Sequence, residues 1–204
     1  MTQKRLILAS ASGVRRKLLA DAGLQFDAVD SLVDEDAVKA GFANGDQSPE
    51  DATDALALAL AEAKALAVSA LHQDALIIGA DQILSCEGRR YDKPKSMAEA
   101  RRNLSAFRGH PHILHSGLVL ARGGEVIWRH SARAVLTMRN FSDAFLDDYL
   151  EEVGERVMKS VGCYQLEGPG VQLFEKIDGD YFSILGLPLL PLLAELRREG
   201  VTGT

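Results

Sequence analysis

The sequence is poor in cysteine and in long apolar runs, and each shortage excludes a class of protein. Cys86 and Cys163 are the only cysteines in 204 residues, and neither lies in a CxxC or Cys/His pattern that would hold zinc. We therefore expect two reduced cysteines rather than a disulfide framework. No apolar stretch approaches the roughly 18 residues that a membrane helix needs, so no association with a membrane is expected.

Basic residues are also scarce. The chain has 23 lysines and arginines against 29 aspartates and glutamates, which gives a net charge of −6. A protein that binds nucleic acid normally presents a basic face, so no nucleic-acid partner is expected. A small anionic substrate is compatible with this balance, because a few gathered arginines and lysines can bind an anion on an acidic protein.

The beginning of the chain lacks the apolar core of a secretion signal. Lys4 and Arg5 precede the letters LILASAS, which imitate a basic region and a small-residue cleavage site. The apolar part spans only Leu6 to Ala9, whereas a signal peptide needs roughly 7–15 such residues. Three basic residues then follow at 15–17. We therefore predict a cytoplasmic protein.

Standard catalytic and nucleotide-binding motifs are missing as well. There is no GxxxxGK[ST], no GxGxxG and no HExxH. Ser183 and the five histidines show no spacing typical of a catalytic triad. In an extended chain, the spacing of these residues puts His110 and His112 on one face and His115 on the other, so these histidines predict no metal site.

What the chain does contain is a regular alternation of helix and strand patterns. The patterns predict strands at 5–9, 26–33, 75–81, 113–121, 125–137 and 171–177, with residues 82–86 continuing in extended form. They predict helices at 14–22, 48–71, 96–107, 142–153 and 187–199. Residues 48–49 and 96–99 carry typical helix-start signals. With no repeats or linkers, we predict one domain over residues 1–204, of class α/β (α+β) with a mixed sheet.

The first candidate site is the stretch from Ser10 to Arg15, where a predicted strand is followed by a helix. The backbone N–H groups of a helix N-terminus, the hydroxyls of Ser10 and Ser12, and Arg15 can together receive phosphate oxygens. The alternative is a serine cap followed by surface arginines. This stretch taken alone is compatible with both.

Acids and lysines farther along the chain form the second group of candidates. Asp81 ends a buried strand, where open α/β sheets bind their ligands, and suits Mg²⁺ binding or the orientation of a water. The alternative is a turn-forming aspartate. The run Asp34-Glu35-Asp36 offers a second carboxylate, although a lone acidic run favours a solvated loop. Lys64 and Lys93 either neutralise phosphate charge or lie at the surface.

The order of these residues resembles that of the Maf family. The shared motifs are Ser10-x-Ser12-x-x-Arg15-x-x-Leu18-Leu19, Asp34-Glu35, Leu60–Ala65, Ile78–Asp81, Lys93-Pro94, Ala100-Arg101, Gly162-x-Tyr164, Ile177-x-Gly179-Asp180-Tyr181 and Gly186-Leu187-Pro188. Each motif is weak alone, but their order and spacing from about residue 6 to 199 are very specific. The chain is identified as a member of this family.

The resemblance implies a nucleoside triphosphate pyrophosphatase that removes unwanted nucleotides from the pool. Water attacks the α-phosphorus and releases a nucleoside monophosphate and pyrophosphate, with Mg²⁺ or Mn²⁺ as cofactor. The implied fold is elongated and two-lobed with a central cleft, similar to inosine-triphosphate pyrophosphatases, and homodimers are frequent. By the family's pattern, Asp81 is the proton acceptor, Ser10, Ser12 and Arg15 form the phosphate-binding loop, Glu35, Lys64 and Lys93 surround the triphosphate, and Asp81 and Glu35 hold the metal.

Three positions relate to which nucleotide base the enzyme accepts. Gln82 and Glu167 resemble the branch that acts on 7-methyl-GTP, whereas the branch that acts on dTTP and UTP tends to have threonine and glutamine there. A carboxylate at 167 can accept hydrogen bonds from the N1–H and the exocyclic amine of guanine. Val14 stands where both branches usually have arginine or tryptophan, and it is a further candidate for substrate binding.

We therefore predict an enzyme with 7-methyl-GTP as its substrate. The alternatives are a dTTP/UTP pyrophosphatase and a non-catalytic nucleotide-binding regulator of cell division. The presence of all four of Glu35, Lys64, Asp81 and Lys93 favours the enzyme over the regulator.

Overall fold

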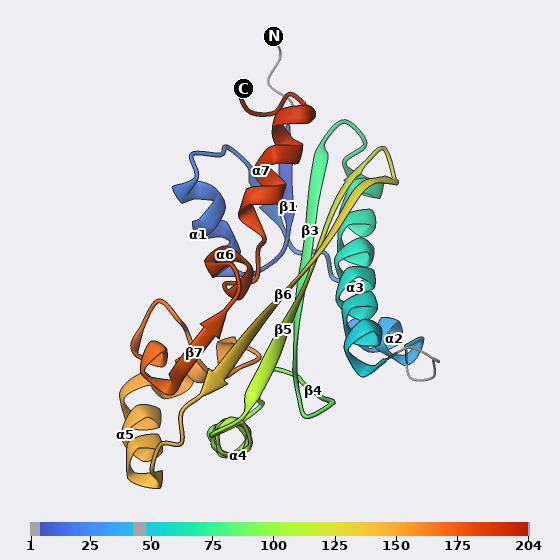
Figure 1. The fold of residues 1–204 in the computed structure, drawn as a ribbon. Helices are drawn as coiled ribbons and strands as arrows, with labels where there is room; N and C mark the ends of the chain where they lie inside the picture. Colours follow the sequence, from blue (N-terminus) through green and yellow to red (C-terminus); the bar gives the residue numbers. More distant parts are fainter. Residues whose placement is uncertain (1–4, 43–47, 204) are drawn as a thin grey trace. The chain divides into compact units, whose positions relative to one another are not determined.

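The computed structural model describes residues 5–42 and 48–203. Within these ranges seven strands form one mixed sheet in the order β2-β1-β3-β5-β6-β7, with β4 paired to β3 (Figure 1). The strands are β1 (Leu6–Ala9), β2 (Asp27–Val29), β3 (Leu76–Cys86), β4 (Arg89–Tyr91), β5 (Pro111–Arg122), β6 (Glu125–Met138) and β7 (Phe174–Asp178). The predicted class of a mixed-sheet α/β protein is confirmed.

Seven α-helices and two 3₁₀ helices accompany these strands in the described part of the chain. The α-helices are α1 (Gly13–Asp21), α2 (Glu35–Ala40), α3 (Pro49–Leu71), α4 (Met97–Phe107), α5 (Asp143–Val153), α6 (Tyr181–Ile184) and α7 (Leu189–Arg198). The 3₁₀ helices are η1 (Gly154–Lys159) and η2 (Pro169–Leu173).

The chain forms two compact units, each made of separate stretches. The first unit contains Met1–Asp81, Ser116–Ala132 and Tyr181–Thr204, and the second contains Gln82–His115 and Arg133–Asp180. Each of β3, β5 and β6 contributes residues to both units. A single domain over 1–204, with two lobes and a central cleft, stays a prediction.

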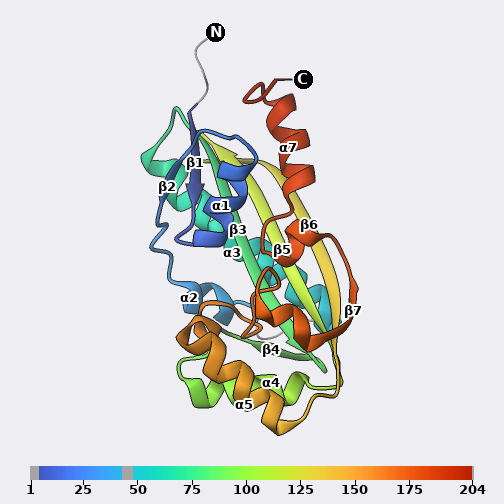
Figure 2. The same ribbon diagram turned by 90° about the vertical axis from the view of Figure 1, so that its left-hand side faces the viewer.

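In the first unit, helices cover both faces of a parallel sheet core. β1 pairs in parallel with β2 and with β3, in a register that runs from Leu6 beside Leu76 to Ala9 beside Gly79. Successive residues of a strand point to opposite faces. Leu6 and Leu8 accordingly pack with α1 and α7, whereas Ile7 and Ala9 pack with α3 on the other face (Figure 2). Nearly every side chain of β1 and of this part of β3 is therefore buried.

Two glycines allow α3 to lie very close to the sheet. A Cβ added to Gly79 on β3 would lie 2.1 Å from the Ala61 carbonyl oxygen, and one added to Gly117 on β5 would lie 2.4 Å from that of Ala57. Such separations are far below a normal contact, so only glycine fits at these two positions. The close approach sets the distance between the α3 backbone and β3, the two elements that carry Lys64 and Asp81.

The second unit contains two antiparallel pairings. β4 pairs with β3 from Leu84 to Cys86, and β7 pairs with β6 from Val135 to Met138. Helix α4 begins at the predicted cap Ser96, and α5, in the range predicted as a helix, is capped by Ser142. The two helices pack against each other (Figure 2). The hydroxyl of Ser96 accepts the Glu99 N–H at 3.2 Å, the side-chain half of the predicted capping box.

Several predicted elements differ from the structure. The strand predicted at 26–33 is only Asp27–Val29, because the Asp30 side chain accepts the Leu32 N–H and Leu32 has a φ of 51°, which turns the backbone out of the extended form. The strand predicted at 171–177 begins only at Phe174, because Pro169 opens a 3₁₀ helix. The closing helix spans Leu189–Arg198 rather than 187–199.

Candidate active site

The loop between β1 and α1 is held together by its own serines. Ser12 is the N-cap of α1, and its hydroxyl accepts the Arg15 N–H at 3.3 Å. The Ser10 hydroxyl accepts the Ser12 N–H at 3.2 Å. The N–H groups of Gly13 and Val14 lie in the first turn, where no helical carbonyl can reach them. The serine cap is thus confirmed. It is compatible with an anion at the helix N-terminus, because the N–H groups of the first turn are not used within the helix.

Arg15 is not the surface arginine of the alternative interpretation. Only 9% of the residue is exposed, and its guanidinium points into the first unit. Nη1 donates to the Ala80 carbonyl at 2.7 Å and to the Ser10 hydroxyl at 3.3 Å, and Nε donates to the Gly186 carbonyl at 2.8 Å. Burial lowers the pKa of Arg15, whereas the carboxylates of Asp81 and Glu35 raise it. An arginine stays charged under both influences.

Lys64 joins two carboxylates that come from different elements. Its Nζ lies 2.6 Å from Asp81 Oδ1 on β3 and 2.7 Å from Glu35 Oε1 on α2. The side chains of Lys64 and Asp81 are 12% and 11% exposed, and that of Glu35 is 44% exposed. The structure therefore brings together three of the four residues that the resemblance assigns to catalysis.

The acidic run 34–36 is a helix start rather than the expected solvated loop. Asp34 caps α2 by accepting the Ala37 N–H at 3.0 Å, and Glu35 and Asp36 are the first-turn acids that favour a helix N-terminus. Lys39 lies in the last turn, where a cation is favourable. These signals were present in the sequence, and together they predict a helix that the acidic run alone did not suggest.

The remaining predicted residues are Val14, Gln82, Lys93 and Glu167. Val14 is partly buried and packs on the apolar cluster formed by α1, α7 and the sheet, so part of its side chain serves the core. Gln82, Lys93 and Glu167 belong to the second unit, in which Lys93 and Glu167 are exposed. Their contribution to the site stays a prediction.

The donor set is suited to a divalent cation that arrives with phosphate. No cluster of three or more His, Cys, Asp or Glu side chains that could hold a metal occurs within residues 5–42 and 48–203. Mg²⁺ in phosphate sites is commonly bound by one or two carboxylates, with phosphate oxygens and water completing its shell. Asp81 and Glu35 are two such carboxylates, and Lys64 contacts one oxygen of each.

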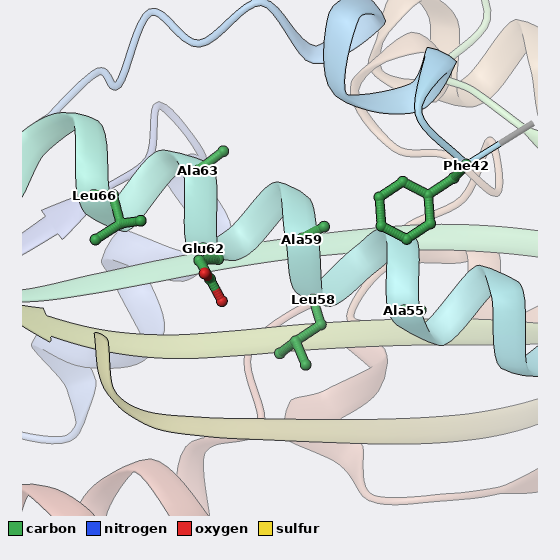
Figure 3. A pocket seen from close by; sticks show the side chains of 7 residues that line it. All are labelled: Phe42, Ala55, Leu58, Ala59, Glu62, Ala63 and Leu66. Atoms are coloured by element: carbon green, nitrogen blue, oxygen red, sulfur yellow. The ribbon is translucent and has the colours of Figure 1, made fainter. Parts of the chain in front are cut away.

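A separate hollow of about 420 Å³ lies along α3 and does not have this chemistry. Its lining is apolar except for Glu62 (Figure 3). The Glu62 carboxylate accepts the Arg129 Nε–H at 2.8 Å. The lining residues are Phe42, Ala55, Leu58, Ala59, Glu62, Ala63 and Leu66. Lys64 follows Glu62 by two positions and therefore projects from another side of the helix. The hollow is thus not the site of Lys64 and its acids.

β3 runs from Leu76 to Cys86, so Asp81 lies within the strand, beyond the end of its pairing with β1, and not at the strand end that the sequence predicted. This aspartate, a lysine shared by two acids and a helix N-terminus opened by serines define an α/β protein with a candidate site for an anionic ligand. The chain belongs to the Maf family: the family described as Maf-like protein matches residues 5–199. None of the helices in the described ranges is long and apolar enough to cross a membrane.

Curated relatives match the chain over nearly its full length. It is 52% identical to a 7-methyl-GTP pyrophosphatase of Rhizobium meliloti over 96% of each chain. It is 50% identical to a nucleoside triphosphate pyrophosphatase of Maricaulis maris, over 97% of each, and 52% identical to one of Caulobacter vibrioides, over 98% of each. A solved dITP/XTP pyrophosphatase from Mycobacterium abscessus aligns at 13% identity and a TM-score of 0.38 over 97% of this chain and 95% of that one, a likeness too distant to carry an argument.

Proposed function

We propose that the protein is a nucleoside triphosphate pyrophosphatase that cleaves its substrate to a nucleoside monophosphate and pyrophosphate. The observation that carries the proposal is the contact of Lys64 with both Asp81 and Glu35, close to the backbone that Arg15 binds. Relatives with about 50% identity over the whole chain bear the names of such enzymes. The proposal thus rests on the contacts of Lys64 with two carboxylates and on the names of these relatives.

The chain's own residues have distinct tasks in this reaction. The N–H groups at the start of α1 bind phosphate oxygens, as helix N-termini do. Asp81 accepts a proton from the water that attacks the α-phosphorus, and pyrophosphate leaves with its bridging oxygen. Lys64 fixes the Asp81 carboxylate through Oδ1, and its charge balances the negative charge that gathers around the triphosphate. Lys93 supplies a second positive charge.

A divalent cation, Mg²⁺ or Mn²⁺, belongs to the proposal. Asp81 and Glu35 would hold it, and its chemistry there is to neutralise phosphate charge as a Lewis acid. The resemblance to the family further supports a cytoplasmic protein that acts as a homodimer on free nucleotides. Its role would be the removal of modified nucleotides before incorporation.

The proposed substrate is 7-methyl-GTP. The support is the pair Gln82 and Glu167, because a carboxylate can accept both purine N–H donors. Relatives with this substrate in their name and relatives with the broader name are equally similar to the chain. Sequence similarity therefore does not distinguish the two names, and a direct comparison of substrates does.

The test is a panel of nucleoside triphosphates with pyrophosphate release as the readout. The purified chain is given 7-methyl-GTP, GTP, ATP, dTTP and UTP, each with Mg²⁺ and again with a chelator. We expect metal-dependent release, fastest with 7-methyl-GTP. Preferred turnover of dTTP or UTP would contradict the substrate and leave the reaction intact. No turnover of any nucleotide, despite measurable binding, would contradict the enzyme and favour the regulator.

A further inference from the structure

Arg15 connects three stretches of the first unit that are far apart in sequence. Its Nη1 binds the Ala80 carbonyl, 65 residues away, and its Nε binds the Gly186 carbonyl, 171 residues away. Nη1 also reaches the Ser10 hydroxyl in its own loop. Buried arginines are uncommon, and they persist where their donors are used in fixed geometry. Here two of the donor nitrogens are already used inside the protein.

The Ala80 carbonyl belongs to the peptide bond that joins Ala80 to Asp81, the proposed proton acceptor. The parallel ladder between β1 and β3 ends at the pair Ala9 and Gly79, so Ala80 lies one residue beyond it. Arg15 provides the donor that β1 no longer provides. Beyond the pairing with β1, the carbonyl of the peptide that joins Ala80 to Asp81 is therefore bound by a side chain.

The Gly186 carbonyl is fixed from the opposite direction. Helix α6 ends in a Schellman motif, in which the Gly186 N–H donates to Ser183 O at 3.0 Å and the Leu187 N–H to Phe182 O at 3.1 Å. Gly186 has a φ of 89°, a left-handed conformation that favours glycine. Leu187 is fully buried in the cluster that Phe182 also contacts. The carbonyl that receives Arg15 thus belongs to a rigid turn.

We propose that Arg15 is a positioning residue that ties the Ala80–Asp81 peptide to the Gly186 turn, which makes the C-terminal segment part of the active site. The inference deepens the proposed pyrophosphatase function and rests on it. Lys64 fixes the side chain of Asp81, whereas Arg15 fixes its backbone. Arg15 then supports turnover chiefly by holding Asp81 in place, and its contribution to substrate affinity is small.

Arg15→Lys is the sharpest variant. Lysine keeps the charge but lacks the fork that reaches two carbonyls at once. A displacement of about 1 Å at a reacting group can cost about 100-fold in rate. We expect kcat to fall about 100-fold, while KM stays within about threefold because ground-state binding is retained. Arg198→Lys, at an exposed arginine that pairs with Glu195 on α7, is the matched control and keeps wild-type kinetics.

Backbone NMR measures the tie itself, independently of activity. Labelling alanine with ¹³C at the carbonyl and aspartate with ¹⁵N selects Ala-Asp peptides, and the chain has two, Ala20-Asp21 and Ala80-Asp81. We expect Arg15→Lys to move the Ala80-Asp81 cross-peak and to leave that of Ala20-Asp21 in place. Gly186→Ala, which strains the turn and leaves Arg15 intact, should move the same cross-peak and lower kcat.

The results separate this inference from the proposed function. An unmoved Ala80-Asp81 cross-peak, or a KM raised more than about tenfold with kcat retained, overturns the positioning role and makes Arg15 a phosphate ligand. A wild-type protein without turnover overturns the pyrophosphatase proposal, and the cross-peaks then still decide whether the tie exists. Far-UV circular dichroism checks folding, and Gly186→Ala decides the matter if Arg15→Lys does not fold.

Discussion

Lys64 Nζ lies 2.6 Å from Asp81 Oδ1, and the same nitrogen lies 2.7 Å from Glu35 Oε1. One cation thus holds two carboxylates that would otherwise repel each other. The three side chains come from β3, α2 and α3 of the first unit, and the close packing of α3 on Gly79 brings the lysine within reach. The arrangement gives Asp81 a fixed orientation.

The first prediction is that Asp81→Asn abolishes most of the turnover. An amide cannot accept the proton of the attacking water, and removal of a general base costs about 100-fold or more in rate. Nucleotide binding should persist, because the phosphate-binding helix end is unchanged. Pyrophosphate release and equilibrium binding of a nucleotide measure the two effects. Asp74→Asn, an exposed aspartate before β3, serves as the control. Retained turnover in Asp81→Asn would mean that another group activates the water.

A second prediction concerns the space between β3 and α3. The added methyl of Gly79→Ala would lie 2.1 Å from Ala61 O and 2.7 Å from Ala65 Cβ, so the helix has to move away. We expect the free energy of unfolding to fall by about 1–3 kcal/mol, the usual cost of overpacking. Turnover should fall as well, because Lys64 moves with the helix. Urea denaturation and kinetics test both effects, and Gly203→Ala, with no atom near its Cβ, should behave as wild type.

Local signals explain why most elements could be predicted. Serine caps at Ser48, Ser96 and Ser142 begin helices where the sequence places them, and the buried strand from Leu76 to Cys86 follows its apolar run. The strand predicted at 26–33 ended early because a single aspartate side chain bent the backbone. Such a bend depends on one residue's conformation, which hydrophobic periodicity does not describe.

The candidate residues could be selected from the sequence, but their contacts could not. Local pattern alone left the loop of Ser10 and Ser12 open to either interpretation, and the order of motifs was needed to assign a function. The partners of Arg15 are backbone carbonyls, and every residue type has one, so no sequence pattern indicates Ala80 or Gly186. Their contact depends on how the whole first unit folds.

A third prediction is acid sensitivity that originates at His112. The imidazole is fully buried, its Nε2 lies 2.8 Å from Tyr164 Oη, and burial lowers its pKa to about 4. In the unfolded chain a histidine has a pKa of about 6.5, so between these values only the unfolded state binds the proton. The stability contributed by neutral His112 is thus complete above about pH 6.5 and is lost as the pH falls towards 4, by about 3 kcal/mol in total.

His112→Phe isolates this contribution. Urea denaturation of both proteins at pH 7.5, 6.0 and 5.0 compares how steeply the free energy of unfolding falls with acidity. The variant leaves the Tyr164 hydroxyl without its partner, so it should be less stable than the wild type at neutral pH. Its free energy of unfolding should fall less steeply as the pH is lowered. Parallel curves for the two proteins would show that another group causes the acid sensitivity.

The last prediction concerns the base. If Glu167 accepts the N1–H and the exocyclic amine of 7-methylguanine, then Glu167→Gln leaves one acceptor and places an N–H against a donor. A donor of the base that loses its acceptor weakens recognition of that base, so we expect kcat/KM for 7-methyl-GTP to fall about 10–100-fold. The kcat/KM for UTP should change little or rise, because an amide can both donate to and accept from a pyrimidine edge. Measuring both substrates with one enzyme preparation cancels errors in the concentration of active enzyme. An equal loss for both substrates would show that Glu167 supports the fold or the phosphates and does not recognise the base.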